Sequence, residues 1–165
     1  MATITMFGKT ITTRGDVPIV GESAPDFSLV NAKLGDVTLA KYQGKKKLLS
    51  IVPSLDTEVC AISTKKFNDA AKEKTDVSFI MISADLPFAM SRFCKAEGTD
   101  NVDTLSMMRS RKFARDYGVL IEEGPLAGIT ARAVVVIDEE NKVIHSELVR
   151  ELSQEPDYDA AFAVL

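Results

Sequence analysis

The sequence predicts a mixed α/β fold in which helices cover both faces of a central sheet. Near-continuous apolar segments at 47–52, 77–83 and 131–137 have the composition of buried strands. Segments with helical spacing of apolar residues follow the first two, and a closing hairpin and a C-terminal helix follow the third. This order of elements is typical of one mixed central sheet.

The chain begins with short strands. Residues 3–7 and 9–13 alternate polar and apolar side chains about Gly8, which predicts an N-terminal β-hairpin. Residues 24–30 and 37–39 have the pattern of two further short strands. All of these elements precede the first buried strand.

The first buried strand, 47–52, is bounded by lysines and by Pro53. A helix is expected directly after it, with Asp56 or Thr57 as its N-cap and Asp76 at its end. The apolar residues that indicate this helix by their spacing are Val59, Ile62, Phe67, Ala70 and Ala71.

A second strand and a short helix follow. The strand covers 77–83, and Asp85 offers an N-cap for the helix. Pro87 lies in the first turn, where its missing N–H costs little, and Gly98 supplies a stop. Cys94 is therefore expected within a short helix.

The remaining elements complete the α/β pattern. Residues 109–117 predict a helix that is closed by Gly118. The third apolar strand, 131–137, turns into a probable antiparallel partner at 142–149, and a C-terminal helix is expected over 156–165.

Composition restricts the classes of function. The 165 residues fit a single domain, 1–165, and the net charge of −4 comes from interspersed acids and bases. Only 45–47 clusters lysines, so neither nucleic acid nor an anionic membrane surface is an expected partner. The first thirty residues hold no signal-like apolar stretch, so a cytoplasmic location is expected. Two cysteines and one histidine form no disulfide scaffold or zinc-ligand set, and no cofactor is expected.

Cys60 is the first candidate for chemistry, because it lies where a strand passes into a helix. The N-terminus of a helix presents unpaired N–H groups and partial positive charge, which favour a thiolate over a thiol. The alternative is a small buried hydrophobe, which is the usual fate of a free cysteine. Position alone leaves these two interpretations evenly balanced.

Pro53, Thr57 and Cys60 form a Pro-x-x-x-Thr-x-x-Cys motif that resembles the active-site motif of the peroxiredoxins. The surrounding residues are similar to their thiol peroxidase subfamily, although Val52 stands where an aromatic residue is frequent and Glu58 adds a carboxylate near the thiol. Further segments that resemble this subfamily are 82–89, 91–94, 124–126, 131–138 and 155–158. The resemblance implies a thioredoxin-like fold, with residues 57–60 in place of the Cys-x-x-Cys motif of thioredoxin.

The resemblance also implies roles for individual residues. Cys60 would attack a hydroperoxide, and Cys94 would resolve the resulting sulfenic acid as an intrachain disulfide, as in atypical two-cysteine peroxiredoxins. Arg132 would be the cation at the site, Thr57 would add a hydroxyl, and Pro53 would shield the sulfur from water. Thioredoxin or a similar dithiol protein would regenerate the enzyme, which would be a homodimer.

Other interpretations of these residues stay open. Without the resemblance, Arg132 is an arginine at a strand end with its head in solvent. Met90, Phe93 and Cys94 have the spacing of a core-facing helical stripe. If Cys94 faces the core, the two thiols are expected to lie apart in the reduced form. The disulfide could then form only if the helix that carries Cys94 unwinds. His145 is expected to be a structural or surface residue.

Two rival functions are weighed against a peroxidase. A thiol-disulfide oxidoreductase acting on proteins is disfavoured, because the chain has no Cys-x-x-Cys motif. A redox-inert or chaperone-like binding module would leave Cys60 unreactive towards peroxide. The resemblance therefore favours a thiol peroxidase that acts on hydrogen peroxide or organic hydroperoxides.

Overall fold

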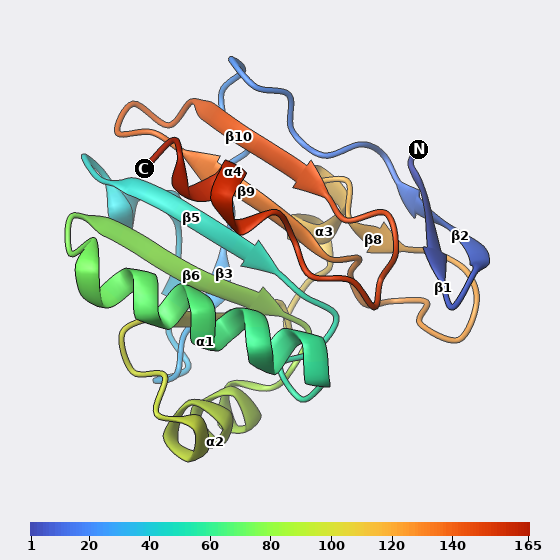
Figure 1. Ribbon diagram of the computed structural model, residues 1–165, viewed down its shortest axis with the longest axis horizontal. Helices are drawn as coiled ribbons and strands as arrows, with labels where there is room; N and C mark the ends of the chain where they lie inside the picture. The colour runs from blue at the N-terminus through green and yellow to red at the C-terminus, as the bar shows by residue number, and fades with distance from the viewer.

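The computed structural model describes residues 1–165 and confirms the mixed central sheet (Figure 1). Strand β5 is parallel to β6, which is parallel to β7, and the other pairs are antiparallel. Across the sheet, the seven strands are β10 (Val143–Leu148), β9 (Ala133–Ile137), β5 (Lys46–Ile51), β6 (Val77–Ser83), β7 (Asp103–Ser106), β3 (Leu29–Val30) and β4 (Asp36–Val37).

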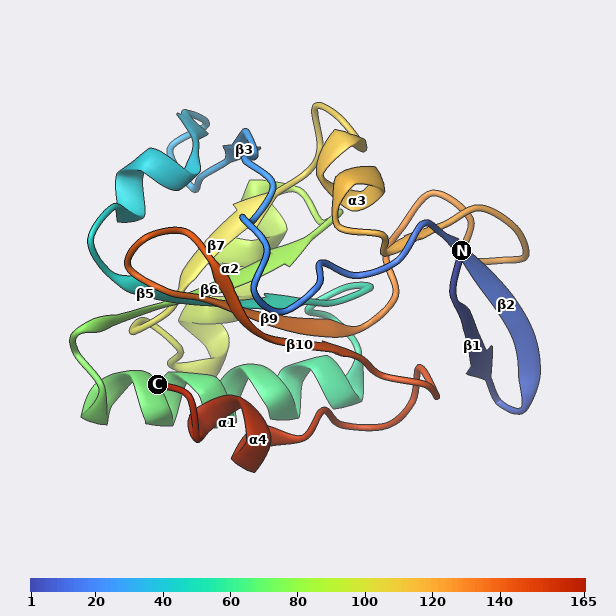
Figure 2. The same cartoon turned by 90° about the horizontal axis from the view of Figure 1, so that it is seen from above.

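Helices cover both faces of this sheet (Figure 2). One face carries α1 (Glu58–Glu73) and α4 (Tyr158–Phe162), and the opposite face carries α3 (Lys112–Asp116) and the 3-10 helix η1 (Leu39–Tyr42). The remaining helix, α2 (Pro87–Glu97), connects β6 to β7. None of these helices has both the length and the apolarity needed to cross a membrane.

The alternation of side chains along β5 separates two cores. Leu48 packs with Phe67 of α1 on one face, whereas Leu49 and Ile51 pack with Phe113 of α3 on the other. Residues 47–51 are buried throughout, because β6 and β9 cover the two edges of β5 and a core covers each of its faces. This confirms the prediction of a central strand buried on both faces.

The N-terminal hairpin is also confirmed. It consists of β1 (Thr3–Met6) and β2 (Lys9–Arg14), and with β8 (Leu120–Ile121) it forms a separate three-stranded sheet. Gly8 has a φ of 77°, which a residue without Cβ adopts readily in the turn. A small third core, Ile4, Ile11, Ile121, Ala131 and Leu152, joins this sheet to the rest of the protein. The hairpin projects at the end of the molecule where α1 begins (Figure 1).

The strand expected over 24–30 is wrong for most of its length, since only Leu29–Val30 pairs as β3. Upstream of it, the Asp26 carboxylate accepts hydrogen bonds from the amides of Phe27 and Leu39 at 2.8 and 3.3 Å. These side-chain bonds take the place of a strand ladder. Leu39 accordingly begins η1 instead of extending the strand expected over 37–39.

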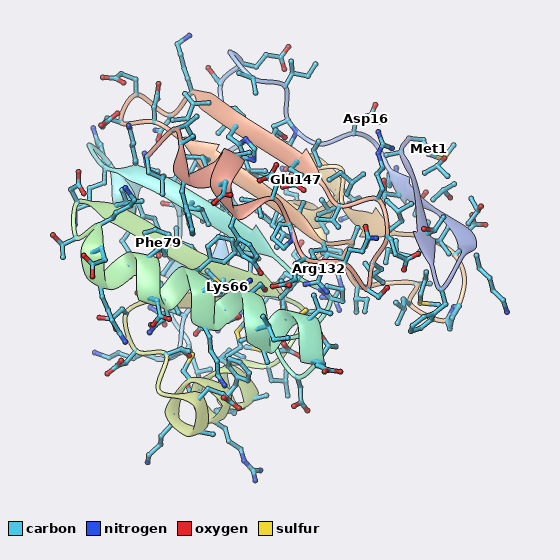
Figure 3. The ribbon with its side chains drawn as sticks, in the orientation of Figure 1. Met1, Asp16, Lys66, Phe79, Arg132 and Glu147 are labelled. Atoms are coloured by element: carbon cyan, nitrogen blue, oxygen red, sulfur yellow. The ribbon has the colours of Figure 1, made fainter.

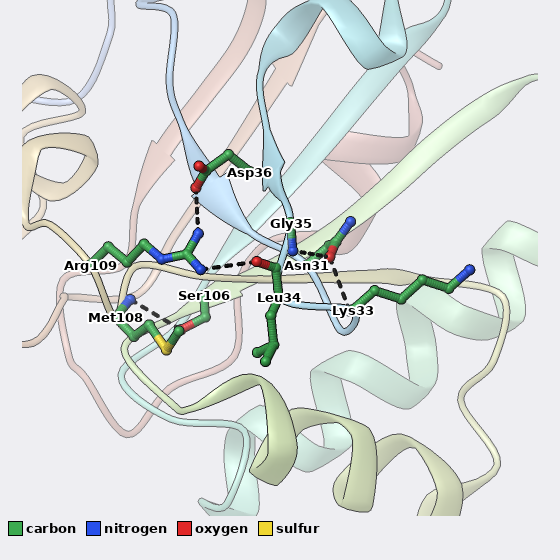
Figure 4. Close-up of polar contacts among 8 residues, drawn as sticks. All are labelled: Asn31, Lys33, Leu34, Gly35, Asp36, Ser106, Met108 and Arg109. Carbon is green, nitrogen blue, oxygen red and sulfur yellow. Dashed lines mark hydrogen bonds and ion pairs between the residues drawn. The ribbon is translucent and has the colours of Figure 1, made fainter.

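The helix expected over 109–117 is also shorter, because α3 begins at Lys112. The Arg109 side chain reaches back to the β3–β4 turn, where it donates to the Asp36 carboxylate at 2.7 Å and to the Leu34 carbonyl at 2.9 Å (Figure 4). The Ser110 hydroxyl accepts from the amide of Lys112 at 3.1 Å, so it starts the helix locally. Gly118 closes the helix with a φ of 66° as expected.

The ends of the other helices differ in detail. Helix α1 ends at Glu73 instead of Asp76. Helix α4 covers only Tyr158–Phe162 of the segment 156–165. It begins at Tyr158 because the Asp157 carboxylate caps it by accepting from the amide of Ala160. The N-cap of α2 is Leu86 instead of Asp85. Pro87 and Gly98 take their predicted places at its two ends.

Candidate active site

Cys60 lies in the first turn of α1, immediately beyond the loop that leaves β5. Thr57 is the N-cap, and its hydroxyl donates to the Ser54 carbonyl at 3.2 Å instead of capping the helix. The Cys60 side chain is fully buried, at 0% exposure, in the core that α1 shares with β5. The alternative interpretation of Cys60 as a buried residue is thus correct for its position. Burial alone does not make the thiol unreactive.

Arg132 is the polar neighbour that distinguishes Cys60 from an ordinary core residue. It immediately precedes β9, is 3% exposed, and donates from Nη1 to the Cys60 sulfur at 3.0 Å. Its Nε and Nη2 donate to the Leu152 carbonyl at 3.3 and 3.0 Å. The alternative of an arginine with its head in solvent is wrong, because the guanidinium is buried beside the sulfur, where the resemblance had placed it. Figure 3 shows Arg132 near the N-terminal end of α1.

A pocket of about 500 Å³ opens beside this pair. Pro53, Thr57 and Arg132 line it, so the structure brings together three of the residues singled out in the sequence around Cys60. Most of the other walls are apolar. The further lining residues are Met6, Phe7, Ser54, Glu58, Val59, Leu126, Ile129, Leu152 and Ser153.

Side chains at the pocket provide a limited set of polar groups. Thr57 and Glu58 are exposed, Pro53 is buried, and the proline contributes no N–H to the site. Thr57 can accept and donate through its hydroxyl, and the guanidinium donates only. The arrangement suits a small ligand whose oxygen atoms reach the sulfur while an apolar group contacts the walls.

Cys94 lies apart from this pocket, in the last turns of α2. It is half-buried, and both cysteines are free thiols. Burial raises the pKa of the Cys94 thiol, and the negative charge of Asp100 adds to this shift. Its carbonyl accepts from the amides of Gly98 and Thr99, so Cys94 takes part in the C-terminal cap.

Sequence reasoning missed three contributors to the site: Leu152, Glu151 and Phe7. Leu152 acts through its carbonyl oxygen, which leaves no trace in the side-chain pattern. Glu151 binds the hairpin turn through a contact between residues far apart in the chain. For Phe7, an aromatic residue beside the turn glycine was the one available signal.

Comparisons with known proteins agree with this geometry. The Redoxin family model matches residues 19–162. A thiol peroxidase of Corynebacterium glutamicum is 49% identical over 158 residues, which cover 96% of this chain and 95% of that protein. Among solved structures, a peroxiredoxin-like protein from Aquifex aeolicus has a TM-score of 0.92 at 40% identity, covering 98% of this chain and 94% of that one. A thiol peroxidase from Chromobacterium violaceum has a TM-score of 0.89 at 27% identity, with the same coverage of the two chains. The chain therefore belongs to the redoxin family, in the thiol peroxidase branch of the peroxiredoxins.

Proposed function

We propose that this peroxiredoxin reduces hydrogen peroxide and organic hydroperoxides with Cys60 as the nucleophile. The Cys60 thiolate attacks one peroxide oxygen, the O–O bond breaks, and the departing oxygen takes up a proton to leave as water or an alcohol. Cys60 becomes a sulfenic acid. The Cys94 thiol then attacks that sulfur and releases water, which leaves a Cys60–Cys94 disulfide within one chain.

The observation that carries this proposal is the 3.0 Å contact between Arg132 Nη1 and the Cys60 sulfur, at a pocket that also exposes the Thr57 hydroxyl. Full ionisation of an ordinary thiol would gain only about thirtyfold in rate at neutral pH, and lower basicity cancels part of that gain. A positioned donor can contribute about a hundredfold or more by stabilising charge on the departing oxygen. The Arg132 guanidinium can both favour the thiolate and donate to the departing oxygen, since it carries five N–H donors.

The proposed resolving step requires one or both helices to lose order near the cysteines. A disulfide requires Cα atoms about 4.4 to 6.8 Å apart, whereas Cys60 begins one helix and Cys94 lies near the end of another. Only Pro87 and Met90 are buried among the eleven residues of α2. A helix with so little buried surface can open locally at small cost in free energy.

The final step returns the protein to its dithiol form. A thioredoxin-type dithiol attacks the disulfide, becomes oxidised itself, and leaves both cysteines reduced. We further propose that the protein works in the cytoplasm as a homodimer, and that it requires neither a metal nor a prosthetic group. Sedimentation velocity tests the dimer, which should have twice the 18.0 kDa mass of the chain.

The decisive experiment compares the parent protein with Cys60→Ser and Cys94→Ser. Stopped-flow mixing with one equivalent of hydrogen peroxide should consume the thiols of the parent and produce an intrachain disulfide, seen as a loss of two hydrogens by mass spectrometry. Cys60→Ser should not react. Cys94→Ser should react at a similar initial rate, stop as a sulfenic acid and overoxidise with excess peroxide.

Two results would contradict parts of this scheme. An unreactive parent protein would favour a redox-inert binding module. Full thioredoxin-dependent turnover by Cys94→Ser would mean that Cys94 is a packing residue and that the protein works with one cysteine.

A further inference from the structure

Glu151 makes an unusual number of hydrogen bonds for a surface carboxylate. One oxygen accepts from the Thr5 hydroxyl at 2.6 Å and from the amide of Gly8 at 3.4 Å. The other accepts from the amide of Phe7 at 3.1 Å and from the hydroxyl and amide of Ser153 at 2.9 and 3.3 Å. These bonds, led by the one from Thr5, lower the pKa of Glu151 to about 2.

Two walls of the pocket meet at this carboxylate. On one side is the turn of the β1–β2 hairpin, where Phe7 lines the pocket. On the other side is Leu152, which also lines the pocket and whose carbonyl holds the Arg132 guanidinium. Backbone bonds between Thr5 and residues 150 and 152 join the same two segments at 2.7 and 2.8 Å.

Phe7 has no packing reason to stand where it does. Its side chain is 82% exposed, and its backbone has a φ of 49°, in the left-handed region that a residue with a side chain adopts at a cost. Phe7 and Gly8 form a two-residue hairpin turn, which requires a positive φ at both positions and so accounts for the conformation. The amides of both residues donate to Glu151. The result is an aromatic side chain at the rim of the pocket, available to an apolar ligand.

We propose that Glu151 is a positioning residue that fixes the hairpin turn as a wall of the pocket and thereby sets the preference for bulky organic hydroperoxides over hydrogen peroxide. This inference rests on the proposed peroxidase function. A substrate with an apolar group contacts Met6 and Phe7, whereas hydrogen peroxide needs only the sulfur, Arg132 and Thr57. Loosening the turn therefore affects the first kind of substrate more than the second.

The test compares kcat/KM for cumene hydroperoxide and for hydrogen peroxide in the parent protein and in Glu151→Gln. The amide keeps the size of the side chain but loses the charge and one acceptor oxygen. In Glu151→Gln we expect kcat/KM for cumene hydroperoxide, divided by kcat/KM for hydrogen peroxide, to fall by about tenfold because KM for cumene hydroperoxide rises. A factor of this size corresponds to losing part of the contact between the substrate and one aromatic ring.

Glu123→Gln is the matched control, because Glu123 accepts from Thr12 on the other strand of the same hairpin at 2.7 Å and does not line the pocket. Its ratio should equal that of the parent. Thr5→Val provides a second variant, which removes the 2.6 Å bond and keeps the charge, and it should shift the ratio in the same direction.

The outcomes separate the inference from the function on which it rests. A parent protein that reduces neither peroxide would overturn both. A parent active with both peroxides, together with an unchanged ratio in Glu151→Gln and Thr5→Val, would overturn only the role of Glu151. Equal losses with both peroxides would also overturn it, since they would indicate general destabilisation.

Discussion

The guanidinium of Arg132 is buried without a carboxylate in hydrogen-bonding contact, and its donors go to a sulfur and a carbonyl oxygen. A buried charge is costly unless hydrogen bonds or an opposite charge compensate it. The Leu152 carbonyl supplies part of this compensation and fixes the direction of the side chain. A thiolate at Cys60 would supply the remaining compensation for the positive charge. The buried guanidinium and the thiolate would thus stabilise each other.

Replacing Arg132 tests this relation. Arg132→Ala should slow the reaction of Cys60 with peroxide by about a hundredfold or more, because the departing oxygen loses a charged donor. Arg132→Lys should recover only part of the rate, since an ammonium cannot donate to the sulfur and to Leu152 in the same planar geometry. Stopped-flow kinetics with hydrogen peroxide measure both, and circular dichroism checks the fold. Unchanged kinetics in Arg132→Ala would leave the arginine a purely structural role.

The raised pKa of Cys94 predicts slow alkylation at neutral pH. In Cys60→Ser, Cys94 is the remaining cysteine, so the dependence of the iodoacetamide rate on pH reports on it alone. The midpoint should lie above that of a free cysteine, about 8.5, because burial disfavours the thiolate. A midpoint at or below this value would mean that the thiol is already solvated in the reduced protein.

Helix α2 buries only two of its eleven residues, Pro87 and Met90. Met90 enters the core beside Phe67, and an ion pair of 2.7 Å joins Glu97 to Lys65 of α1. Exposed ion pairs contribute about 0 to 1 kcal/mol, so this contact adds little to the stability of the helix. The cap formed on the Cys94 carbonyl must also open if the last turn unwinds.

Oxidation should therefore change the order of α2. Hydrogen exchange measured by mass spectrometry should be faster over 87–97 in the disulfide form than in the reduced form, and also faster in the first turn of α1. The last turns of α1, up to Glu73, serve as an internal reference and should stay protected. Equal protection of all these segments in both redox forms would rule out local unfolding as the route to the disulfide.

At the scale of the whole molecule, two cores on the faces of the central sheet provide most of the buried apolar surface, and a third joins the hairpin to them. The hairpin is thus joined to the rest of the protein by the smallest of the three cores, and the Glu151 carboxylate adds charge-assisted hydrogen bonds there. Such bonds are stronger than those between neutral groups. The free energy of unfolding should therefore depend on pH, because protonation of Glu151 removes the charge from these bonds.

The low pKa of Glu151 gives this dependence a definite sign. Its value of about 2 lies below the ordinary 4.5, so its contribution to stability is fully present above about pH 4.5 and is lost as the pH falls towards 2. The difference in unfolding free energy between the parent and Glu151→Gln should therefore shrink over this interval. Denaturant titrations at pH 6 and pH 2.5 measure it. A difference that does not change with pH would mean that the carboxylate charge makes no contribution.

The sequence alone predicts the long strands of the central sheet and the grouping of Pro53 and Thr57 near Cys60, because each has a local signal. Apolar runs identify β5, β6 and β9, and a motif within eight residues brings Pro53 and Thr57 to Cys60. Two of the errors occur where a side chain bonds to a segment that lies further along or back in the chain. Asp26 interrupts a predicted strand and Arg109 shortens a predicted helix in this way.

The burial of Arg132 could not be read from the sequence for a related reason. Its main acceptor is the Leu152 carbonyl, a backbone atom twenty residues away that any residue would provide. The Glu151 contacts with Phe7 and Gly8 join positions more than 140 residues apart. Only the assembled tertiary structure brings these groups to the same pocket.

The hairpin sheet shares no strand with the central sheet, although it supplies two residues to the pocket. The two side chains proposed to contact a substrate tail, Met6 and Phe7, therefore belong to a different sheet from β9, the strand that follows Arg132. A new pair of side chains at Met6 and Phe7 could be introduced without altering Cys60, Arg132 or the strands that hold them. Engineering a peroxidase for a chosen hydroperoxide would then begin with the tip of one hairpin.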